Sequence, residues 1–400
     1  MRLLASQVAE ATGGRLVGPD GEVDGANFDS RAVEPGQLFV PIVAERDGHD
    51  FIAAAIEAGA PAYLTSKEPV GGTAIVVGDT NVALMELAGW ARSRVSIPVV
   101  GITGSVGKTS TKDLAAAAVG ASRRTTANER SFNNEQGLPV TMLGAPDDTE
   151  VLIVEMGMRG FGEITKLCDV ASPTIGLITA VAAAHTGRVG GIDGVAAAKR
   201  ELVEALTPSG TASLNADDPR VAAMRSHTDA SVVTYGVDGD VRLVSVELDE
   251  LARPRLTVDT PWGDGQVQLS VTGAHMAHNA AAAVAVAGVV VGSIDEALAA
   301  LASASVSGMR MQVERAPSGF VVVNDAYNAN PDSMRAALDA LAAMRADRRI
   351  AVLGLMAELD DPASAHQQVM NDALERGIEV VAVGTDLYGL RPVDDPVAAL

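Results

Sequence analysis

The chain has 400 residues, a formal net charge of −21 and a hydrophobic content of 48%. This length exceeds that of one ordinary domain, so about two or three domains are expected. The negative charge argues against a nucleic-acid surface or an anionic membrane surface as partner. No apolar run reaches membrane-spanning length and no secretory leader opens the sequence, so we expect a cytoplasmic protein without membrane insertion. The single cysteine, Cys168, excludes a disulfide framework.

Residues 1–85 have the pattern of a small α/β unit. A glycine follows each of its helical segments, as happens after many helices. The short apolar runs between and after them are typical of strands. The expected elements are helices over 8–14 and 51–59 and strands over 37–43, 62–65 and 74–77.

A glycine-rich segment at 101–110, Gly-Ile-Thr-Gly-Ser-Val-Gly-Lys-Thr-Ser, follows a short apolar run and precedes a sequence of helical composition. This order is typical of a phosphate-binding loop, where glycines let the backbone approach the ligand and the first N–H groups of the helix face the phosphates. Lys108 would lie against the β- and γ-phosphates, and the Thr109 hydroxyl would reach Mg²⁺. We therefore expect ATP to be bound by Gly104, Ser105, Gly107, Lys108, Thr109 and Ser110.

The loop is a variant, because the strict pattern has glycine six residues before the lysine, where this chain has Ile102. The alternative is a glycine-rich turn with a surface lysine. It is disfavoured because strand, glycines, Lys-Thr and helix occur in the required order. Only five of the 30 basic residues are lysines. A lysine in the loop of a chain that otherwise uses arginine favours a phosphate-binding role for Lys108, because the ammonium group is a compact point charge.

Residues 86–308 form a second expected unit, in which strands and helices alternate around the phosphate loop. Alternation of this kind predicts a parallel sheet covered by helices. The later segment, 241–272, has the pattern of antiparallel strands. The other expected elements are strands over 151–155, 174–179 and 211–214 and helices over 194–206 and 277–291.

A third unit is expected from residue 309 to residue 400. Its strands and helices alternate as in a second doubly wound sheet. The expected elements are strands over 320–324, 350–353 and 380–383 and helices over 331–344 and 363–375.

Several polar residues follow expected strands at their carboxyl ends, where open α/β sheets bind ligands. Glu155 is placed to hold Mg²⁺, with a capping or salt-bridging glutamate as an equal alternative. His185 follows the strand over 174–179, although a lone histidine is more often structural. Asp325 ends a strand of the third unit, where its carboxylate could bind ribose hydroxyls. A helix or turn cap is an equal alternative.

Two further candidates are weaker when taken alone. Lys199 lies in an expected helix among small neighbours, and a solvated helix charge is the favoured interpretation because lysines are mostly exposed. Asn133 and Asn134 open a polar segment with glycine and proline, which predicts a loop able to contact a substrate.

Taken in order, these segments resemble the Mur ligase family of ATP-dependent amide-forming enzymes. The most specific segment is 325–334, Asp-Ala-Tyr-Asn-Ala-Asn-Pro-Asp-Ser-Met, because sister ligases differ there. Near the start, Asp29-Ser-Arg31 and Asp47-Gly-His-Asp-Phe51 look like the nucleotide-sugar domain of the family. The resemblance covers nearly the whole chain, and its other segments are 104–112, 133–141 and 155–164.

The resemblance implies an α/β fold of three domains. Residues 1–85 would bind a UDP-sugar, and 86–308 would form a P-loop, parallel-sheet domain that binds ATP. Residues 309–400 would form a short Rossmann-like domain that binds the incoming dipeptide. The implied activity is addition of D-Ala-D-Ala to UDP-MurNAc-tripeptide through an acyl phosphate, in peptidoglycan precursor synthesis. ATP and Mg²⁺ would be the cofactors, and the protein would be a monomer.

The resemblance also implies roles for single residues. Lys108, Lys199 and His185 would be catalytic, and Thr109, Glu155, His185 and carbamylated Lys199 would form the metal site, which overturns the solvated interpretation of Lys199. Asn279 would contact adenine, near His275. The third domain would offer Arg310, Asp325 and Asn328 to ATP, whereas Ser30, Arg31, Asn133 and Asn134 would bind substrate.

The sequence departs from the family pattern at a few places. Leu355 stands where the family usually has Asp, Asp360 where it has Gly, and Met276 where Asn is common. The chain ends at Leu400, before the Lys-Gly-Ser-Arg-like segment that usually closes the third domain. Two alternatives therefore stay open, namely another amino-acid ligase of the family and a nucleotide-binding protein without turnover. Segment 325–334 weighs against the first, and the intact candidate site residues weigh against the second.

Overall fold

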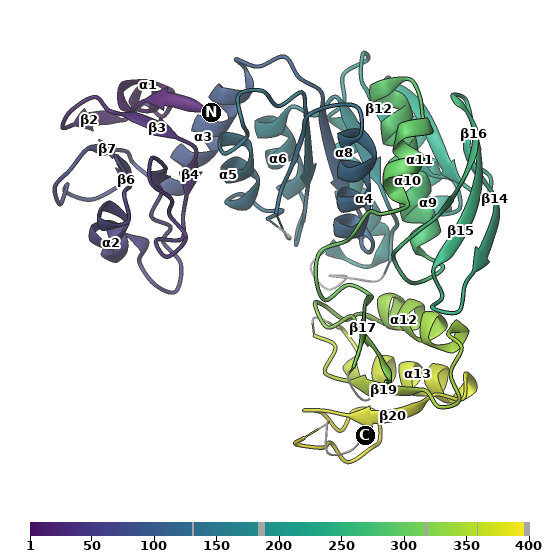
Figure 1. The fold of residues 1–400 in the computed structure, drawn as a ribbon. Coiled ribbons are helices and arrows are strands. Elements are labelled where there is room, and N and C mark those ends of the chain that lie inside the picture. The colour runs from purple at the N-terminus through teal and green to yellow at the C-terminus, as the bar shows by residue number, and fades with distance from the viewer. Residues whose placement is uncertain (130–131, 183–188, 317–318, 358, 396–400) are drawn as a thin grey trace.

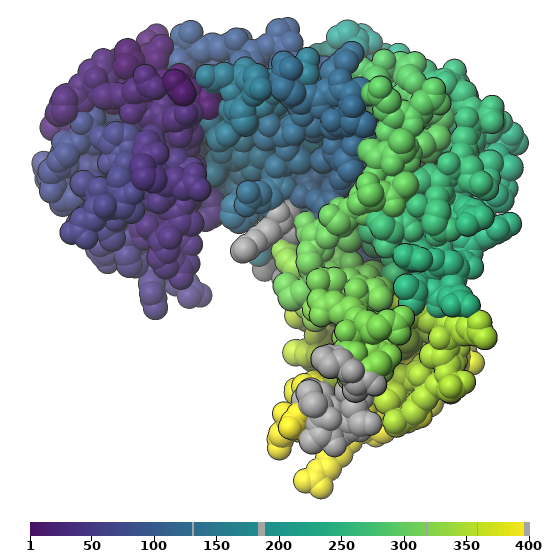
Figure 2. Space-filling view, viewed as in Figure 1, coloured from purple at the N-terminus to yellow at the C-terminus, as the bar shows by residue number. Residues whose placement is uncertain are grey.

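A nine-stranded mixed sheet forms the middle of the molecule, with one smaller α/β unit on each side of it along the chain (Figure 1). The computed structural model describes residues 1–129, 132–182, 189–316, 319–357 and 359–395. Within them no helix is both long and apolar enough to cross a membrane. The space-filling view shows an arch, with an open hollow between the N-terminal and C-terminal units (Figure 2).

The N-terminal unit contains a five-stranded sheet in the order β2-β7-β6-β5-β4 and a two-stranded ladder of β1 and β3. The expected elements are present, but the strand predicted over 37–43 is only two residues long. The unit comprises β1 (Arg2–Leu4), α1 (Ala5–Ala11), β2 (Arg15–Val17), β3 (Glu22–Asp24), β4 (Ala26–Asn27), β5 (Leu38–Phe39), the 3₁₀ turn η1 (Gly48–Phe51), α2 (Ile52–Glu57), β6 (Tyr63–Thr65), β7 (Ala74–Val76) and α3 (Thr80–Arg92).

The large sheet has the order β16-β15-β14-β13-β12-β11-β8-β10-β9. The strands that come first in the chain pair in parallel. They are β8 (Val99–Thr103), β9 (Thr125–Ala127), β10 (Val151–Glu155), β11 (Ile175–Ile178), β12 (Thr211–Asn215) and β13 (Ser231–Gly236). The remaining strands are β14 (Val241–Leu248), β15 (Pro254–Thr260) and β16 (Gly263–Gln268), and they pair with one another in antiparallel fashion. The sheet is therefore mixed rather than purely parallel, because β14 joins the antiparallel strands to β13.

Helices cover both faces of this sheet. Successive residues of β8 point to opposite faces, so that Val99 enters one hydrophobic cluster and Val100 and Ile102 enter another. One face carries α5 (Gly137–Leu143), α6 (Glu163–Ala171) and α8 (Ile192–Glu204), and the other carries α4 (Lys108–Gly120), α10 (Met276–Val291) and α11 (Asp295–Leu301). The short helices α9 (Pro219–Ala222) and η2 (Ala223–His227) follow β12.

The C-terminal unit alternates strands and helices as expected, but its described strands do not form one continuous sheet. Antiparallel β17 and β18 form one ladder, and parallel β19 and β20 form another. The elements are β17 (Gln312–Arg315), β18 (Val321–Asn324), α12 (Pro331–Ala343), β19 (Ile350–Leu353), α13 (Pro362–Glu375) and β20 (Glu379–Ala382).

The hydrophobic clusters connect the three units unequally. Leu64 of the N-terminal unit, Leu87 of α3 and Leu138 of the central unit belong to one continuous buried cluster. The boundary expected between residues 85 and 86 thus falls inside α3, which packs on both sides. The C-terminal unit instead has a buried cluster of its own, around Leu338 and Val369. The N-terminal unit is therefore joined to the sheet by shared core. The C-terminal unit is joined to it by the linker and by Met311 and Ala340, which enter the cluster around α4 and α10.

Candidate active site

The phosphate-loop sequence connects the carboxyl end of β8 to the first turn of α4, as predicted. Gly104 and Gly107 both have positive φ angles, +152° and +81°. A Cβ at Gly104 would overlap the hydroxyl of Thr179, and a Cβ at Gly107 would lie 2.9 Å from Oδ1 of Asn279. These two positions need glycine, and the loop keeps its backbone open toward the start of α4.

Lys108 folds back over the loop, where its Nζ donates to the carbonyl of Gly104 at 2.9 Å. Burial lowers the pKa of Lys108, the charge of Glu155 opposes this shift, and the charge of Arg310 adds to it. The lysine therefore lies close to a carboxylate of the central unit and to a guanidinium of the linker. An anion entering the loop would meet both cations.

The carboxylate of Glu155 is 1% exposed at the end of β10 and has two hydrogen-bond donors. Thr109 Oγ1 donates to Oε2 at 2.6 Å, and Asn133 Nδ2 donates to Oε1 at 2.7 Å. The neighbouring strands β8 and β10 are parallel, so their carboxyl ends bring Thr109 and Glu155 to one edge of the sheet. The structure thus joins three of the residues that the sequence singled out.

Asn128 is a buried member of this site that sequence reasoning missed. Its Oδ1 accepts the backbone N–H of Glu155 at 2.8 Å, and its carbonyl accepts Nζ of Lys112 at 2.5 Å. The residue is 1% exposed, directly after β9. A polar residue at the carboxyl end of a strand was the available signal, but the three-residue β9 is too short to recognise from its sequence.

Lys199 lies on α8 and is only 3% exposed, so the interpretation as a solvated helix charge is wrong. Burial and the nearby charge of Lys108 lower its pKa well below the ordinary lysine value. Burial of this kind favours the uncharged amine, which is a nucleophile. His185, the other expected metal ligand from this part of the chain, lies outside the described residues.

A cavity of about 240 Å³ lies between the start of α4 and the linker that leads to the C-terminal unit. Asn279 is 9% exposed in its wall and reaches over Gly107. The wall also includes Ser110, His275, Arg310 and Asp325. Residues expected around ATP from the central and the third unit therefore meet in one cavity.

Two half-buried side chains of this cavity have pKa values shifted by desolvation. Burial raises the pKa of Asp325 to about 6, against the lowering effects of the Met311 N–H and the charge of Arg310. Burial also lowers the pKa of His275 to about 4, helped by the charge of His278. His275 is therefore a neutral imidazole near pH 7.

Several residues predicted to bind ATP or substrate lie outside the cavity or form hydrogen bonds within the protein. Asn328 is exposed and lies outside the cavity wall. Asn134 accepts the backbone N–H of Gly137 at 2.9 Å at the start of α5. Ser105 binds the loop after β11, where its Oγ accepts the N–H of Ala182 at 2.9 Å. Ser30 and Arg31 lie in a turn of the N-terminal unit, and the guanidinium of Arg31 pairs with Asp29 at 2.7 Å.

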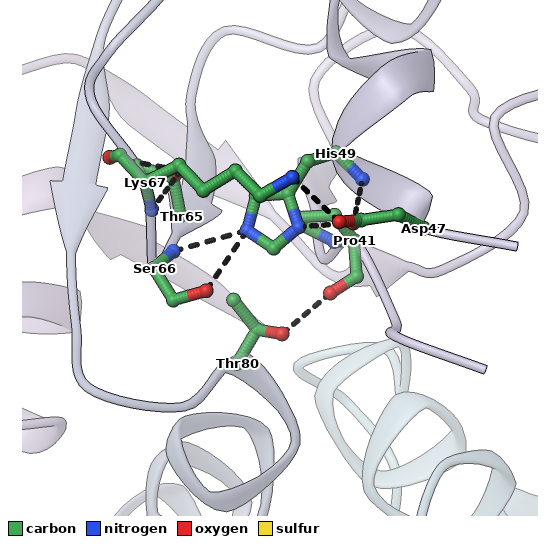
Figure 3. Close-up of polar contacts among 7 residues, drawn as sticks. All are labelled: Pro41, Asp47, His49, Thr65, Ser66, Lys67 and Thr80. Atoms are coloured by element: carbon green, nitrogen blue, oxygen red, sulfur yellow. Dashed lines mark hydrogen bonds and ion pairs between the residues drawn. The ribbon is translucent and has the colours of Figure 1, made fainter.

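A polar cluster in the N-terminal unit joins the loop before α2 to the loop after β6 (Figure 3). Nδ1 of His49 lies 2.6 Å from Oδ1 of Asp47, whose other oxygen binds Nζ of Lys67 at 2.6 Å. The backbone N–H of Ser66 donates to Nε2 of His49 at 3.0 Å. Because Nε2 accepts this bond, Nδ1 carries the ring proton. The hydroxyl of Ser66 also lies 3.2 Å from Nε2, so the backbone N–H and the hydroxyl share the one lone pair of this nitrogen. Asp47, His49 and Ser66 therefore clamp two segments of the N-terminal unit together.

Comparison with known proteins assigns all three units to one family. Sequence profiles for the Mur ligase catalytic, middle and glutamate ligase domains match residues 22–90, 102–287 and 309–394. The UDP-N-acetylmuramoyl-tripeptide–D-alanyl-D-alanine ligase of Mycobacterium tuberculosis is 42% identical over 96% of this chain and 84% of its own length. The enzyme of the same name from Escherichia coli is 33% identical over 96% of this chain and 86% of its own length.

Solved structures agree with this assignment. A crystal structure of MurF from Acinetobacter baumannii superposes with a TM-score of 0.88, at 29% identity, over 96% of this chain and 86% of that one. MurF from Thermotoga maritima, solved in complex with ADP, superposes with a TM-score of 0.81, at 25% identity, over 94% of this chain and 90% of that one. The fold, the phosphate loop and these relatives together establish that the chain belongs to the Mur ligase family, on its MurF branch.

Proposed function

We propose that the protein is an ATP-dependent ligase that joins D-Ala-D-Ala to UDP-MurNAc-tripeptide in peptidoglycan precursor synthesis. The observation that carries this proposal is the meeting of Lys108, Thr109, Glu155 and Lys199 around the phosphate loop of a MurF relative. These side chains come from three elements, α4, β10 and α8. They supply the cation and the oxygen ligands that phosphoryl transfer to a carboxylate uses, and a buried amine that can be carbamylated.

The reaction must first make a carboxylate reactive, because its negative charge repels an amine nucleophile. An oxygen of the tripeptide carboxylate attacks the γ-phosphorus of ATP, which forms the acyl phosphate and releases ADP. The amine of D-Ala-D-Ala then attacks the acyl carbon, phosphate leaves, and the amine loses a proton as the amide forms. Lys108 offsets charge on the phosphates, and Arg310 adds a second cation from the linker.

The residues around Glu155 fit a magnesium ion. Mg²⁺ prefers oxygen ligands and is usually held by one or two carboxylates together with substrate phosphates. Glu155 and Thr109 provide a carboxylate and a hydroxyl 2.6 Å apart beside the loop. When bound, Mg²⁺ would neutralise negative charge on the phosphates. Thr109 and Glu155 would hold it, and His185 is proposed as a further ligand of the metal site.

Lys199 is proposed to carry a carbamate. In its uncharged form the buried amine can add to carbon dioxide and lose a proton, which replaces the lysine amine by a carboxylate-like anion. This supplies a negative ligand for a second Mg²⁺. The low exposure of Lys199 and its lowered pKa support this chemistry.

The substrates are proposed to approach from the two outer units. Ser30 and Arg31 would bind the UDP part, Asn133 and Asn134 would contact the tripeptide, and the C-terminal unit would bind D-Ala-D-Ala. Asn279, Arg310, Asp325 and Asn328 would bind ATP. A monomer in the cytoplasm remains our expectation. The three domains are proposed as 1–85, 86–308 and 309–400, with α3 shared between the first two.

The proposal is tested by ADP release from the purified protein with Mg-ATP and UDP-MurNAc-tripeptide. We expect release to require D-Ala-D-Ala, and to be lost in Lys108→Met but kept in Lys166→Met, which alters an exposed lysine. Release with single amino acids in place of the dipeptide would instead indicate another ligase of the family. Binding of ATP without release under any of these conditions would contradict the proposal.

A further inference from the structure

The linker between the central and C-terminal units has an unusual backbone. Met309 and Met311 both have left-handed φ angles, +59° and +50°. This conformation is unfavourable for residues with a Cβ, and it persists where surrounding contacts fix the chain. Arg310, proposed above to reach ATP, lies between these two residues. The contacts that hold the linker therefore decide where its guanidinium points.

The downstream end of the linker is fixed to the C-terminal unit. The Met311 N–H donates to Oδ1 of Asp325 at 2.9 Å, and the Tyr327 N–H donates to the carbonyl of Met309 at 3.2 Å. The guanidinium carbon of Arg310 lies 4.1 Å from the centre of the Tyr327 ring. These contacts set the orientation of Arg310 relative to the C-terminal unit.

The upstream end is fixed to the helix that begins at the phosphate loop. Both the backbone N–H and the Oγ of Ser307 donate to Oδ2 of Asp113, at 2.7 and 2.8 Å. Asp113 lies on α4, and its side chain is 14% exposed. Two hydrogen bonds to one carboxylate oxygen are strong and directional, so they define the position of Ser307.

Asp113 is connected to the metal-site carboxylate through buried groups. Its Oδ1 pairs with Nζ of Lys112 at 2.8 Å, and the same Nζ donates to the carbonyl of Asn128 at 2.5 Å. Asn128 in turn accepts the N–H of Glu155 at 2.8 Å. The linker is thus tied to the same buried network that holds the phosphate loop and β10.

We propose that Asp113 is a positioning residue for the ligase reaction. It anchors Ser307 to the phosphate-loop helix, and the strained linker carries this position to Arg310 in the nucleotide cavity. Asp113 touches neither phosphate nor carboxylate substrate in this account and acts through Arg310. The proposal rests on the proposed function, because it names ATP as the ligand that Arg310 contacts.

The test is the KM for each substrate in Asp113→Ala. We expect the KM for ATP to rise about tenfold, as for the loss of hydrogen bonds to a charged group. The KM for UDP-MurNAc-tripeptide should stay within twofold, because none of the residues proposed to bind that substrate lies on the linker. The matched control is Asp259→Ala, which removes an exposed aspartate paired with Arg242 and should change neither constant. An unchanged KM for ATP in a folded Asp113→Ala protein, or equal rises for both substrates, would overturn the proposal.

A second variant covers the case in which Asp113→Ala takes its carboxylate partner from Lys112 and prevents folding. Ser307→Ala keeps the backbone N–H bond and loses the Oγ bond, so the KM for ATP should rise about threefold. No rise in that variant would refute the positioning role. If the wild type bound ATP without turnover, titration with the non-hydrolysable analogue AMPPNP would still decide the matter. Weaker analogue binding in Asp113→Ala would support the anchor although the ligase proposal had failed, and equal binding would refute it.

Discussion

The hydroxyl of Thr109 donates to the carboxylate of Glu155 across 2.6 Å, although the two residues lie 46 positions apart in the chain. The strand β8, which leads into the phosphate loop before Thr109, is the parallel neighbour of β10, which ends at Glu155, so the fold itself brings the two oxygen ligands together. Buried carboxylates are stable only with such partners. The pair therefore serves stability in this structure, and we propose that it serves Mg²⁺ during the reaction.

Thr109→Val tests this pair with little change in shape. It leaves a buried carboxylate oxygen without a donor, which should lower the free energy of unfolding by about 1–3 kcal/mol. ADP release should fall about a hundredfold or more, as when an electrostatic ligand of a transition state is lost. Thr109→Ser keeps the hydroxyl and should retain most activity. Turnover of the valine variant within threefold of the wild type would show that the hydroxyl is dispensable.

Lys199→Met should abolish ligase activity without lowering the thermal stability of the protein. Removing a buried, desolvated amine should leave the melting temperature unchanged or higher, whereas ligase turnover should be lost. In ¹³C-labelled bicarbonate, a carbamate signal should be visible by NMR in the wild type and absent from the variant. Lys166→Met is the control, because Lys166 is exposed on α6, and it should keep both signal and turnover. A wild type without the signal would contradict the carbamate.

Replacement by alanine should change stability in opposite directions at Gly104, in the phosphate loop, and at Gly120, at the end of the helix that follows it. Gly104→Ala places a Cβ against Thr179 at a positive φ, so it should cost about 1–3 kcal/mol of stability and weaken ATP binding. Gly120→Ala, near the end of α4, has nothing within 4 Å of the new Cβ and should stabilise by about 0.5–1 kcal/mol. Thermal unfolding and ATP titration measure both effects. Equal behaviour of the two variants would refute this account of the loop.

Asp325→Asn should give a pH-dependent gain in stability. The folded pKa of about 6 lies above the ordinary aspartate value, so the protonated carboxyl group contributes fully to stability below the ordinary value. This contribution is lost as pH rises through 6 and the side chain ionises. At pH 7.5 the asparagine variant should melt higher than the wild type, and at pH 4.5 the difference should be smaller. Its KM for ATP should rise, since the charge is proposed to contact the nucleotide. Equal melting differences at both pH values would contradict the buried charge.

The phosphate loop could be predicted from sequence because its requirements are local. Positive φ at Gly104 and Gly107, the lysine that follows and the helix after it all lie within a few residues. Glu155 could be placed at a strand end for the same reason. Burial of Lys199 could not be predicted, because alanine neighbours suit both a solvated helix and one packed into a core.

Longer-range features depended on tertiary packing. Asn128 is recognisable only when β9 is seen beside β10. The expected boundary at residues 85 and 86 falls inside α3, because the sequence does not reveal that one apolar cluster continues from the N-terminal unit into the central one. The anchor of Ser307 on Asp113 joins residues 194 positions apart, and no local pattern marks it.

The most direct test of the central claim follows one oxygen atom. UDP-MurNAc-tripeptide labelled with ¹⁸O in its terminal carboxylate is incubated with the protein, Mg-ATP and D-Ala-D-Ala, and the released phosphate is analysed by mass spectrometry. Because an acyl phosphate passes one carboxylate oxygen to the departing phosphate, we predict one ¹⁸O atom in each phosphate formed with the pentapeptide product. Pentapeptide formed together with unlabelled phosphate would contradict the acyl-phosphate route, and phosphate released without pentapeptide would contradict ligation.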